Sequence, residues 1–502
     1  MTIVQPISTT TALPQTHTID IVIRNAEVLD GSGTAAYRAD LGISDQKIVA
    51  IAPALSLQGY EILDASGLVV APGFIDVHTH DDREVLDAPN MLPKLTQGVT
   101  TVITGNCGIS LSPWAADRTP PAPLSLIGTQ ADFRYASVQD YVKAVKQSQP
   151  AVNVGILIGH STLRVNAVAD LQTGANAEEL QRMQDLLAEG MHAGALGFSS
   201  GLFYQTSKAA DNQEVIALAK ISAAAGGVYT SHIRDEYNGV MQALAEAFDA
   251  GAEAKLPVIL SHHKCAGPAN WGRTTETLAY ISERKRSQAI GLDAYPYTAG
   301  STVLDPDYVD GVIRIMISFS EPHPEMQGRD LADIATEWGV DQKEAARRLH
   351  PAGAVYFQMR EDDVERVLSY PHTMIGSDGL PHDSHPHPRL WGAFPRVLGH
   401  YSRDKKLFTL AEAVRRMTTL SADHFGLKQR GRIAPDCWAD LVIFDPATIS
   451  DQATFASPKQ AATGIHWVLV NGAIALEKGV PSPSRHGQFL ERRQERFPGI
   501  PV

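Results

Sequence analysis

The sequence predicts a (β/α)8 barrel of the TIM type that carries a small β-sandwich domain built from both chain ends. Three observations lead to this fold. Short apolar runs alternate with helical stretches through the middle of the chain, and many of these runs end in a polar residue. Short β-type runs separated by turn residues open and close the chain. Eight strand–helix units favour a closed barrel over an open sheet.

Composition limits the class of protein before any motif is considered. The 502 residues are 44% hydrophobic and 20% charged, which is typical of globular proteins and excludes a mostly disordered chain. The formal net charge is −13, and the longest basic cluster before the C-terminal tail is residues 284–286, so we expect no nucleic-acid partner. No run of 18 apolar residues occurs, so we expect no membrane partner.

The cysteine count and the N-terminal pattern indicate a compartment. Three cysteines cannot form a disulfide framework in a chain of this length, which favours a reducing environment. The threonine-rich residues 1–17 lack the pattern of a secretion signal, and we expect a loose arm there and a tail at 491–502. The predicted localisation is cytoplasmic. The oligomeric state is left open.

The chain ends predict one small domain. β-type runs occur at residues 19–24, 41–44, 48–51 and 61–70, and again at 439–444 and 467–470. Neither set could bury much apolar surface alone, so we assign residues 18–72 and 428–490 to one β-domain. Two separate β appendages are the alternative.

Residues 73–427 are predicted to form the barrel. The eight expected strands are residues 73–80, 100–107, 153–160, 194–200, 227–232, 257–262, 289–296 and 373–378. Helical segments such as 178–193, 212–225 and 240–250 lie between them. The distance from the sixth strand to the eighth is long, which predicts an insertion after the seventh strand. We expect residues 300–353 to form a lid or a small subdomain at the active-site face.

The carboxyl ends of these strands carry a set of residues that could bind zinc. They are His78 and His80 on the first strand, Cys107 on the second, His232 on the fifth, His262 on the sixth and Asp378 on the eighth. Residues two apart on a strand face the same side, so both imidazoles of the first strand can face one ion. Alone, a strand-end histidine is often only solvated or a satisfied core residue, and a single cysteine is often a small buried apolar residue. Together they predict a Zn2+ site.

Two histidines compete for one position on the sixth strand. His263 follows His262, and adjacent strand residues face opposite sides of a sheet. The apolar residues 258–260 lead directly into Ser261 and His262. We therefore predict His262 as the ligand.

The motifs resemble a known family. Residues 74–80, Phe-Ile-Asp-Val-His-Thr-His, resemble the opening signature of the amidohydrolase superfamily. Residues 104–108, 261–264 and 376–382 are similar to motifs of the N-acyl-D-amino-acid deacylases, also called D-aminoacylases, and the resemblance covers nearly the whole chain. Related cyclic amidases and dipeptidases bridge two metals with a carboxylated lysine from strand four. Residues 194–200 contain no lysine, and the resemblance implies that Cys107 takes the bridging position.

The resemblance also divides the ligands. It implies that Cys107, His232 and His262 hold one tight zinc, and that His78, His80 and Asp378 line a second, weaker position. Zinc lowers the pKa of a bound water to about 7 and polarises a carbonyl group. An amide nitrogen must be protonated before it leaves, and Asp378 is the predicted proton shuttle. A role for Asp378 as a metal ligand only, or as a strand cap, is the alternative.

Candidate substrate contacts follow the barrel strands. Arg389, Lys264 and Tyr204 are expected to hold a substrate carboxylate, and the resemblance points to the same three. Tyr295 and Ser301 are further candidates for orienting the substrate, and Phe203 and Met359 are expected to form an apolar pocket. Residues 302–310 contain three aspartates and no cation, so this loop would repel an acidic side chain. Aspartates that face solvent, with Phe203 in the core, are the alternative.

Three functions remain. The first is zinc-dependent hydrolysis of N-acyl-D-amino acids with neutral apolar side chains, which are expected to be better substrates than D-aspartate or D-glutamate derivatives. The second is another amide hydrolase of the superfamily, acting on a cyclic amide or a dipeptide, which predicts a lysine on strand four and no cysteine ligand on strand two. The third is a scaffold without activity, which would have lost metal ligands. The preference for the D configuration rests on the resemblance alone.

Overall fold

The computed structural model describes residues 19–492, so the predicted N-terminal arm and nearly all of the predicted C-terminal tail lie outside the described residues. Eight parallel strands form the central sheet. In chain order they are β6 (Phe74–Asp76), β7 (Val99–Thr104), β10 (Asn153–Gly159), β11 (Gly197–Gly201), β12 (Val228–His232), β13 (Val258–Leu260), β14 (Ile290–Ala294) and β18 (Thr373–Ile375). Every residue of these strands is buried, which is typical of a parallel sheet covered on both faces.

The sheet closes just beyond the last residues of its first and last strands. The N–H of Asp378 donates to the carbonyl of His78 at 2.7 Å, and the N–H of His80 donates to the carbonyl of Gly379 at 3.0 Å. The order β18-β14-β13-β12-β11-β10-β7-β6 therefore returns to its start through a short bridge between Thr79 and Gly379. The predicted eight-stranded barrel is confirmed. Its closing seam contains three of the candidate ligands, His78, His80 and Asp378.

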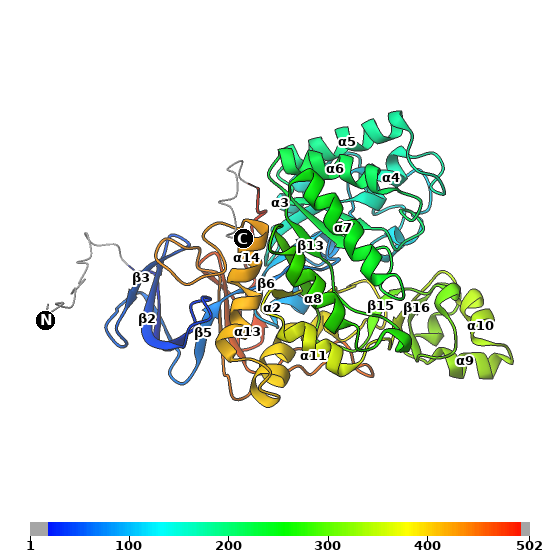
Figure 1. Cartoon of the computed structure of the whole chain (residues 1–502). Coiled ribbons are helices and arrows are strands. Elements are labelled where there is room, and N and C mark those ends of the chain that lie inside the picture. Colours follow the sequence, from blue (N-terminus) through cyan, green and yellow to red (C-terminus); the bar gives the residue numbers. More distant parts are fainter. Residues whose placement is uncertain (1–18, 493–502) are drawn as a thin grey trace, which may run out of the picture.

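Helices surround the barrel (Figure 1). They include α1 (Glu84–Asp87), α2 (Leu92–Leu95), α3 (Val138–Ser148), α4 (His160–Ala167), α5 (Ala177–His192), α6 (Asn212–Ala224), α7 (Val240–Ala254), α8 (Thr274–Arg284), α11 (Glu361–Ser369), α12 (Arg389–Arg396), α13 (Leu410–Met417) and α14 (Thr419–Phe425). The capping residues of helix α5 show how the sequence determines where a helix begins. The Asn176 side chain accepts hydrogen bonds from the N–H groups of Glu178 and Glu179, and the Glu179 carboxylate accepts one from the Asn176 N–H.

The two chain ends form one mixed sheet. Its strands are β1 (Ile21–Val28), β2 (Tyr37–Ser44), β3 (Lys47–Ala52), β4 (Glu61–Asp64), β5 (Val69–Pro72), β19 (Leu441–Phe444), β20 (Ile465–Val470), β21 (Ala473–Glu477) and β22 (Val480–Pro481). β5 pairs antiparallel with β19, which joins the N-terminal and C-terminal strands. A separate apolar cluster that includes Ile23, Leu41, Leu441 and Leu469 fills this unit. Joint burial by both ends, rather than two appendages, is what the structure shows.

The long connection after β14 folds as a unit of its own. It contains β15 (Gly300–Val303), β16 (Ile315–Ser320) and β17 (Ala352–Tyr356) in one antiparallel sheet, with α9 (Leu331–Trp338) and α10 (Gln342–Leu349). Leu304, Ile317 and Leu331 belong to its own apolar cluster. Figure 1 shows this unit at the end of the molecule opposite the mixed sheet.

A short pair, β8 (Trp114–Ala115) and β9 (Arg134–Tyr135), follows β7. No helix within residues 19–492 has the length and apolar character that crossing a membrane requires.

Candidate metal-dependent active site

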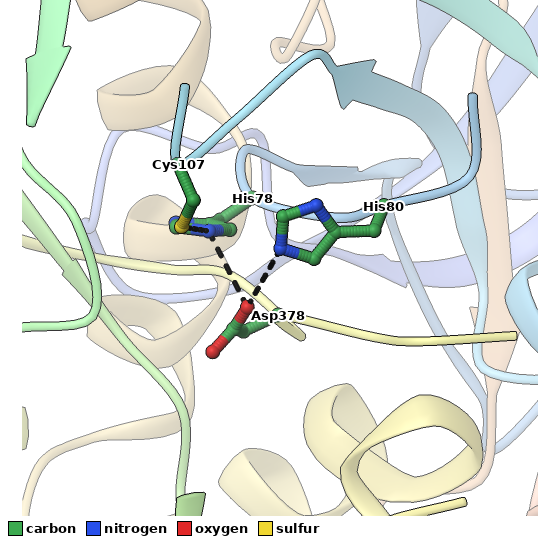
Figure 2. A group of neighbouring side chains, drawn as sticks. All are labelled: His78, His80, Cys107 and Asp378. Carbon is green, nitrogen blue, oxygen red and sulfur yellow. Dashed lines mark hydrogen bonds and ion pairs between the residues drawn. The ribbon is translucent and has the colours of Figure 1, made fainter. Parts of the chain in front are cut away.

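The six predicted ligands converge at the carboxyl ends of the barrel strands in two groups. One group contains His78, His80, Cys107 and Asp378 (Figure 2), and the other contains Cys107, His232 and His262. All members are buried, and within each group the candidate ligand atoms lie within 4.8 Å of one another. Cys107 belongs to both groups, so its Sγ is the atom that two neighbouring ions could share.

The distances between ligand atoms fit a bound metal. Sγ of Cys107 lies 3.2 Å from Nε2 of His78 and 3.4 Å from Nε2 of His262. Nε2 of His262 lies 3.1 Å from Nδ1 of His232, and Oδ1 of Asp378 lies 3.2 Å from Nε2 of His80. Ligand atoms about 2.0–2.3 Å from one tetrahedral zinc ion are roughly 3.3–3.8 Å apart. The thiolate, imidazole and carboxylate donors are also the types that zinc binds.

The turn that presents Cys107 depends on small neighbours. Cys107 has a φ of 53°, in the left-handed region, and lies between Gly105 and Gly108, which also have positive φ. A Cβ on Gly201 of β11 would lie 2.1 Å from the carbonyl oxygen of Cys107. The hydroxyl of Ser199 accepts a hydrogen bond from the N–H of Gly108. Gly201 and Ser199 of β11, the fourth barrel strand, therefore give the turn at Cys107 the space and the hydrogen bond that it requires.

Positive φ recurs at two other candidate ligands. His262 has a φ of 36° and Asp378 a φ of 48°. Non-glycine residues rarely adopt this region, and such strain concentrates at functional sites. The backbone bond from Asp378 to His78 and the side chain of Asp293 hold these two turns in place, because Asp293 Oδ1 accepts the N–H of His262 at 2.9 Å.

Two carboxylates that we did not single out from the sequence orient the histidines. Asp293 lies at the end of β14 and approaches Nδ1 of His78 at 3.2 Å. Glu236 follows β12, and its Oε1 lies 3.0 Å from Nδ1 of His262. Such partners fix the ring and tautomer of a metal-binding histidine. Asp293 could have been predicted from the sequence, because it is a polar residue at a strand end. No feature of the sequence pointed to Glu236.

A third unexpected element is a buried lysine behind the seam. Nζ of Lys94 donates to Asp76 at 2.8 Å and to the hydroxyls of Thr79 and Ser377 at 2.9 Å. Asp76 also accepts the N–H of Ser377 at 2.8 Å. These bonds tie the strand that carries His78 and His80 to the strand that carries Asp378.

Charges in the site favour metal binding. Burial alone would raise the pKa of the Cys107 thiol, but His78 and His262 outweigh it and hold that pKa well below its usual value. Burial lowers the pKa of His232, so its imidazole is neutral. Metals bind thiolate and neutral imidazole, and the site holds Cys107 and His232 in these forms. Cys107 and the neighbouring carboxylates raise the pKa values of His78, His80 and His262 in spite of burial, so these three rings would release a proton when an ion binds.

Asp378 is held as a carboxylate. Burial would raise its pKa, but Arg389, His262 and His78 outweigh burial and hold the pKa well below its usual range. Oδ2 of Asp378 lies 2.9 Å from Nη1 of Arg389. Asp378 is therefore anionic near neutral pH.

A cavity opens above the ligands. It is lined by His80, His232, His262 and Asp378, by the predicted substrate contacts Phe203, Tyr204, Lys264, Tyr295 and Ser301, and by further residues such as Leu126, Glu236, Tyr237, Asp305, Tyr308 and Leu380. The hydroxyl oxygen of Ser301 is buried and has no hydrogen-bond partner within the described chain. Tyr204 shares a hydrogen bond of 3.1 Å with Thr302. Five of the seven predicted substrate contacts thus share one cavity with the ligands.

Two predicted substrate contacts lie elsewhere. Met359 does not line this cavity, because its side chain faces a separate small cavity behind Lys264 and Tyr295. Arg389 is also absent from the lining. Its guanidinium pairs with Asp378, donates to the carbonyl of Ser301 at 3.1 Å and lies 4.5 Å from the ring centre of Tyr295. Met359 therefore does not line the cavity beside the candidate ligands, and Arg389 approaches that cavity through Asp378 and Ser301.

The aspartates of the loop after β14 differ from one another. Asp305 lines the cavity. Asp307 is exposed and pairs with Lys343 at 3.2 Å, and Asp310 is exposed. Phe203 is half-buried and stacks between His232 and Tyr308, with ring centres 5.2 and 5.0 Å away. One of the three aspartates and Phe203 are therefore at the cavity.

Comparison with known proteins agrees with this geometry. A model of the amidohydrolase family matches residues 61–292 and 285–476. Over 473 residues the chain is 48% identical to a D-aminoacylase of Alcaligenes xylosoxydans xylosoxydans, a match that spans 94% of this chain and 98% of that relative. The chain belongs to the D-aminoacylase family of amidohydrolases. An N-acyl-D-glutamate deacylase of the same organism is 44% identical over 484 residues, which are 96% of this chain and 98% of that relative.

Solved structures of the D-aminoacylase family share the fold. One D-aminoacylase, described with a binuclear centre in which one metal activates and the second attenuates, is 47% identical with a TM-score of 0.93 over 94% of this chain and 100% of that chain. N-acyl-D-glutamate deacylase from Bordetella bronchiseptica, complexed with zinc and a phosphonate that mimics the tetrahedral intermediate, is 45% identical with a TM-score of 0.92 over 95% and 100%. As a member of this family the protein is a metal-dependent amidohydrolase, as predicted, and at the level of the family the predicted zinc cofactor is confirmed.

Proposed function

We propose that the protein hydrolyses the amide bond of N-acyl-D-amino acids to a carboxylate and a free D-amino acid, and that it prefers neutral apolar side chains. The observation that carries this proposal is the single cavity that joins both ligand groups to Lys264, Tyr295 and Ser301. The relatives named above are deacylases of D-amino acid derivatives. The alternative of a cyclic amidase or dipeptidase has less support, because strand four contains no lysine to bridge two metals.

The buried donors fit zinc in both positions. Cys107, His232 and His262 would hold the tight ion, and His78, His80 and Asp378 would line the weaker position beside the same sulfur. When bound, zinc supplies a Lewis acid for the scissile carbonyl and a water whose pKa is about 7. Glu236 and Asp293 keep the imidazoles of His262 and His78 oriented for this purpose.

Asp378 would move the proton. Its carboxylate lines the cavity, is anionic and lies next to both imidazoles of the first strand. It accepts a proton from the attacking water and returns it to the amine nitrogen as the C–N bond breaks. The guanidinium of Arg389 holds the carboxylate at a fixed orientation through their 2.9 Å contact.

The substrate carboxylate would bind on the side of β13 to β15. Lys264 is buried, lines the cavity and supplies the positive charge, although Glu236 shares it at 2.6 Å. Ser301 offers a hydroxyl that has no hydrogen-bond partner among residues 19–492, and the hydroxyls of Tyr204 and Tyr295 line the same cavity. Arg389 adds a second cation behind Ser301. Charge-assisted bonds of this kind are the strong ones in a buried site.

The side chain of the amino acid would pack on an aromatic wall. Tyr308 of the inserted unit stacks on Phe203 and on Tyr237, with ring centres 5.0 and 5.5 Å apart. These rings provide apolar surface, and the carboxylate of Asp305 at the same cavity disfavours an acidic side chain.

A substrate panel tests the proposal. Purified protein with and without added Zn2+ is assayed for amine release from N-acetyl derivatives of both enantiomers of methionine, leucine, phenylalanine, valine, aspartate and glutamate. We expect turnover of the D enantiomers that depends on zinc, with a higher kcat/KM for N-acetyl-D-methionine than for N-acetyl-D-glutamate. A preference for the glutamate derivative would refute the pocket, and absence of any D-specific turnover would refute the activity.

A further inference from the structure

The cavity has two chemically distinct walls. His80, Leu126 and Leu380 come from the ends of β6 and β18 and from the loop after β7, which are neighbours in the barrel. Phe203, Tyr237, Tyr308 and Asp305 come from the loops after β11 and β12 and from the inserted unit on the opposite side. The first wall has two leucines beside the candidate ligands His80 and Asp378, whereas the second is aromatic and carries the carboxylate of Asp305.

The carboxylate-binding groups decide which part of the substrate faces which wall. Ser301 lies on β15, and Asp305 follows it four residues later along the same segment. A substrate whose carboxylate is bound at Ser301 would therefore extend its amino-acid half along β15 toward Asp305. Its acyl group, on the other side of the scissile carbonyl, would face Leu126 and Leu380.

Hydrogen bonds hold the Asp305 backbone and side chain, and its carboxylate has no cationic partner among the described residues. Its N–H donates to the hydroxyl of Tyr356 at 3.0 Å, and its Oδ1 accepts the N–H of Asp307 at 2.9 Å. Among residues 19–492, no lysine, arginine or histidine forms an ion pair with Asp305, in contrast to Asp307 and its partner Lys343. The side chain is half-buried and lines the cavity, so its carboxylate can meet a cation that a ligand brings.

We propose that this subsite also accepts long cationic side chains, so that Nα-acyl derivatives of D-arginine and D-lysine are substrates and Asp305 is the residue that selects them. This inference rests on the proposed deacylase function and extends its side-chain preference. The methylene stem of such a side chain packs on Phe203 and Tyr308 as an apolar side chain would, and its cation reaches the carboxylate.

The test compares side chains that differ mainly in charge. Nα-acetyl-D-arginine, its neutral isostere Nα-acetyl-D-citrulline and N-acetyl-D-methionine are assayed with wild type and with Asp305→Asn, which keeps the acceptor for the N–H of Asp307. In wild type we expect kcat/KM for the arginine derivative to exceed that for the citrulline derivative by about tenfold or more. Asp305→Asn should bring this ratio to about one, and the methionine derivative reports how much active enzyme each preparation contains.

Asp307→Asn is the matched control. It makes the same charge change two residues away, at an exposed side chain that pairs with Lys343, and should leave the arginine-to-citrulline ratio unchanged. A ratio near one in wild type, a ratio that Asp305→Asn does not alter, or an equal effect of both variants would overturn the inference. If wild type turns over none of the three compounds, the proposed function has failed. In that case, calorimetric titration of wild type with the arginine and citrulline derivatives measures the ratio of their binding affinities. A ratio near one would overturn the role of Asp305, and a ratio of about tenfold or more would support it.

Discussion

Oδ2 of Asp378 lies 2.9 Å from Nη1 of Arg389, while Oδ1 of the same carboxylate lies 3.2 Å from Nε2 of His80. One side chain thus contacts both the candidate metal site and the buried cation behind the substrate cavity. A change at either end of this contact should alter catalysis in a distinguishable way.

Asp378→Asn should lower kcat by about 10²- to 10⁴-fold, because an amide cannot accept the proton of the attacking water. Zinc in the position formed by Cys107, His232 and His262 should remain, since Asp378 is not a member of that group. Steady-state kinetics and metal analysis on the same preparation check both parts. Loss of this zinc together with Asp378 would make the carboxylate a structural ligand instead of a proton shuttle.

Arg389→Ala should weaken the use of substrates with a free carboxylate by about 2 kcal/mol or more in kcat/KM. The variant should also discriminate less between a free acid and its amide than wild type does. Parallel assays of N-acetyl-D-methionine and its amide measure this. Equal losses on both compounds would show that Arg389 acts on Asp378 alone.

Cys107→Ala should lose zinc and activity, because alanine offers no ligand in place of the shared sulfur. Cys265→Ala is the control. Burial raises the pKa of the Cys265 thiol to about 12, and this residue faces the separate cavity behind Lys264. It should keep full zinc content and turnover. Retention of zinc and turnover by Cys107→Ala would show that the site is assigned wrongly.

Glu214 should make stability depend on pH in the acid range. Burial raises its pKa, but His160 and Arg164 outweigh burial and lower it to about 2 from the usual 4.5. A carboxyl group with a lowered pKa stabilises the folded state fully above its unfolded value and loses that effect as the pH falls toward 2. Glu214→Gln should therefore lower the free energy of unfolding by about 3 kcal/mol at pH 7.

The deficit of Glu214→Gln should shrink as the pH falls below about 4.5, which urea unfolding from pH 7 to pH 3 would measure. Glu253→Gln, at an exposed pair with Lys220, should change stability by less than about 1 kcal/mol at any pH. A deficit for Glu214→Gln that stays constant with pH would rule out a charge effect at Glu214.

The sequence predicted the parts of the site that strand order controls. Parallel strands all end at one rim, so a polar residue at each strand end can be placed without a structure. His78, Cys107 and His262 were found in this way, and their ligand atoms do meet. The same reasoning does not reach side chains that come from loops or helices. Glu236 follows β12 by four residues and Lys94 lies on α2, so their contacts depend on the three-dimensional path of the chain.

The direction in which a side chain points could not be predicted from the sequence either. Gln358 lines the cavity, yet the next residue, Met359, lines the separate cavity behind Lys264 and Tyr295. Of three aspartates in one loop, only Asp305 faces the cavity, since Asp307 turns to Lys343 on α10. Spacing identifies such a loop as acidic but does not say which carboxylate is inside.

The left-handed backbone at Cys107, His262 and Asp378 limits how this centre could be re-engineered for another metal. Aspartate and asparagine adopt that conformation more readily than other L-residues, whereas threonine and valine resist it. Replacing Cys107 by aspartate would keep the turn and exchange a soft sulfur for a hard oxygen, which shifts preference from zinc toward manganese. The conformation of the turn at Cys107 would therefore allow an oxygen ligand in place of sulfur, whichever ion the site holds.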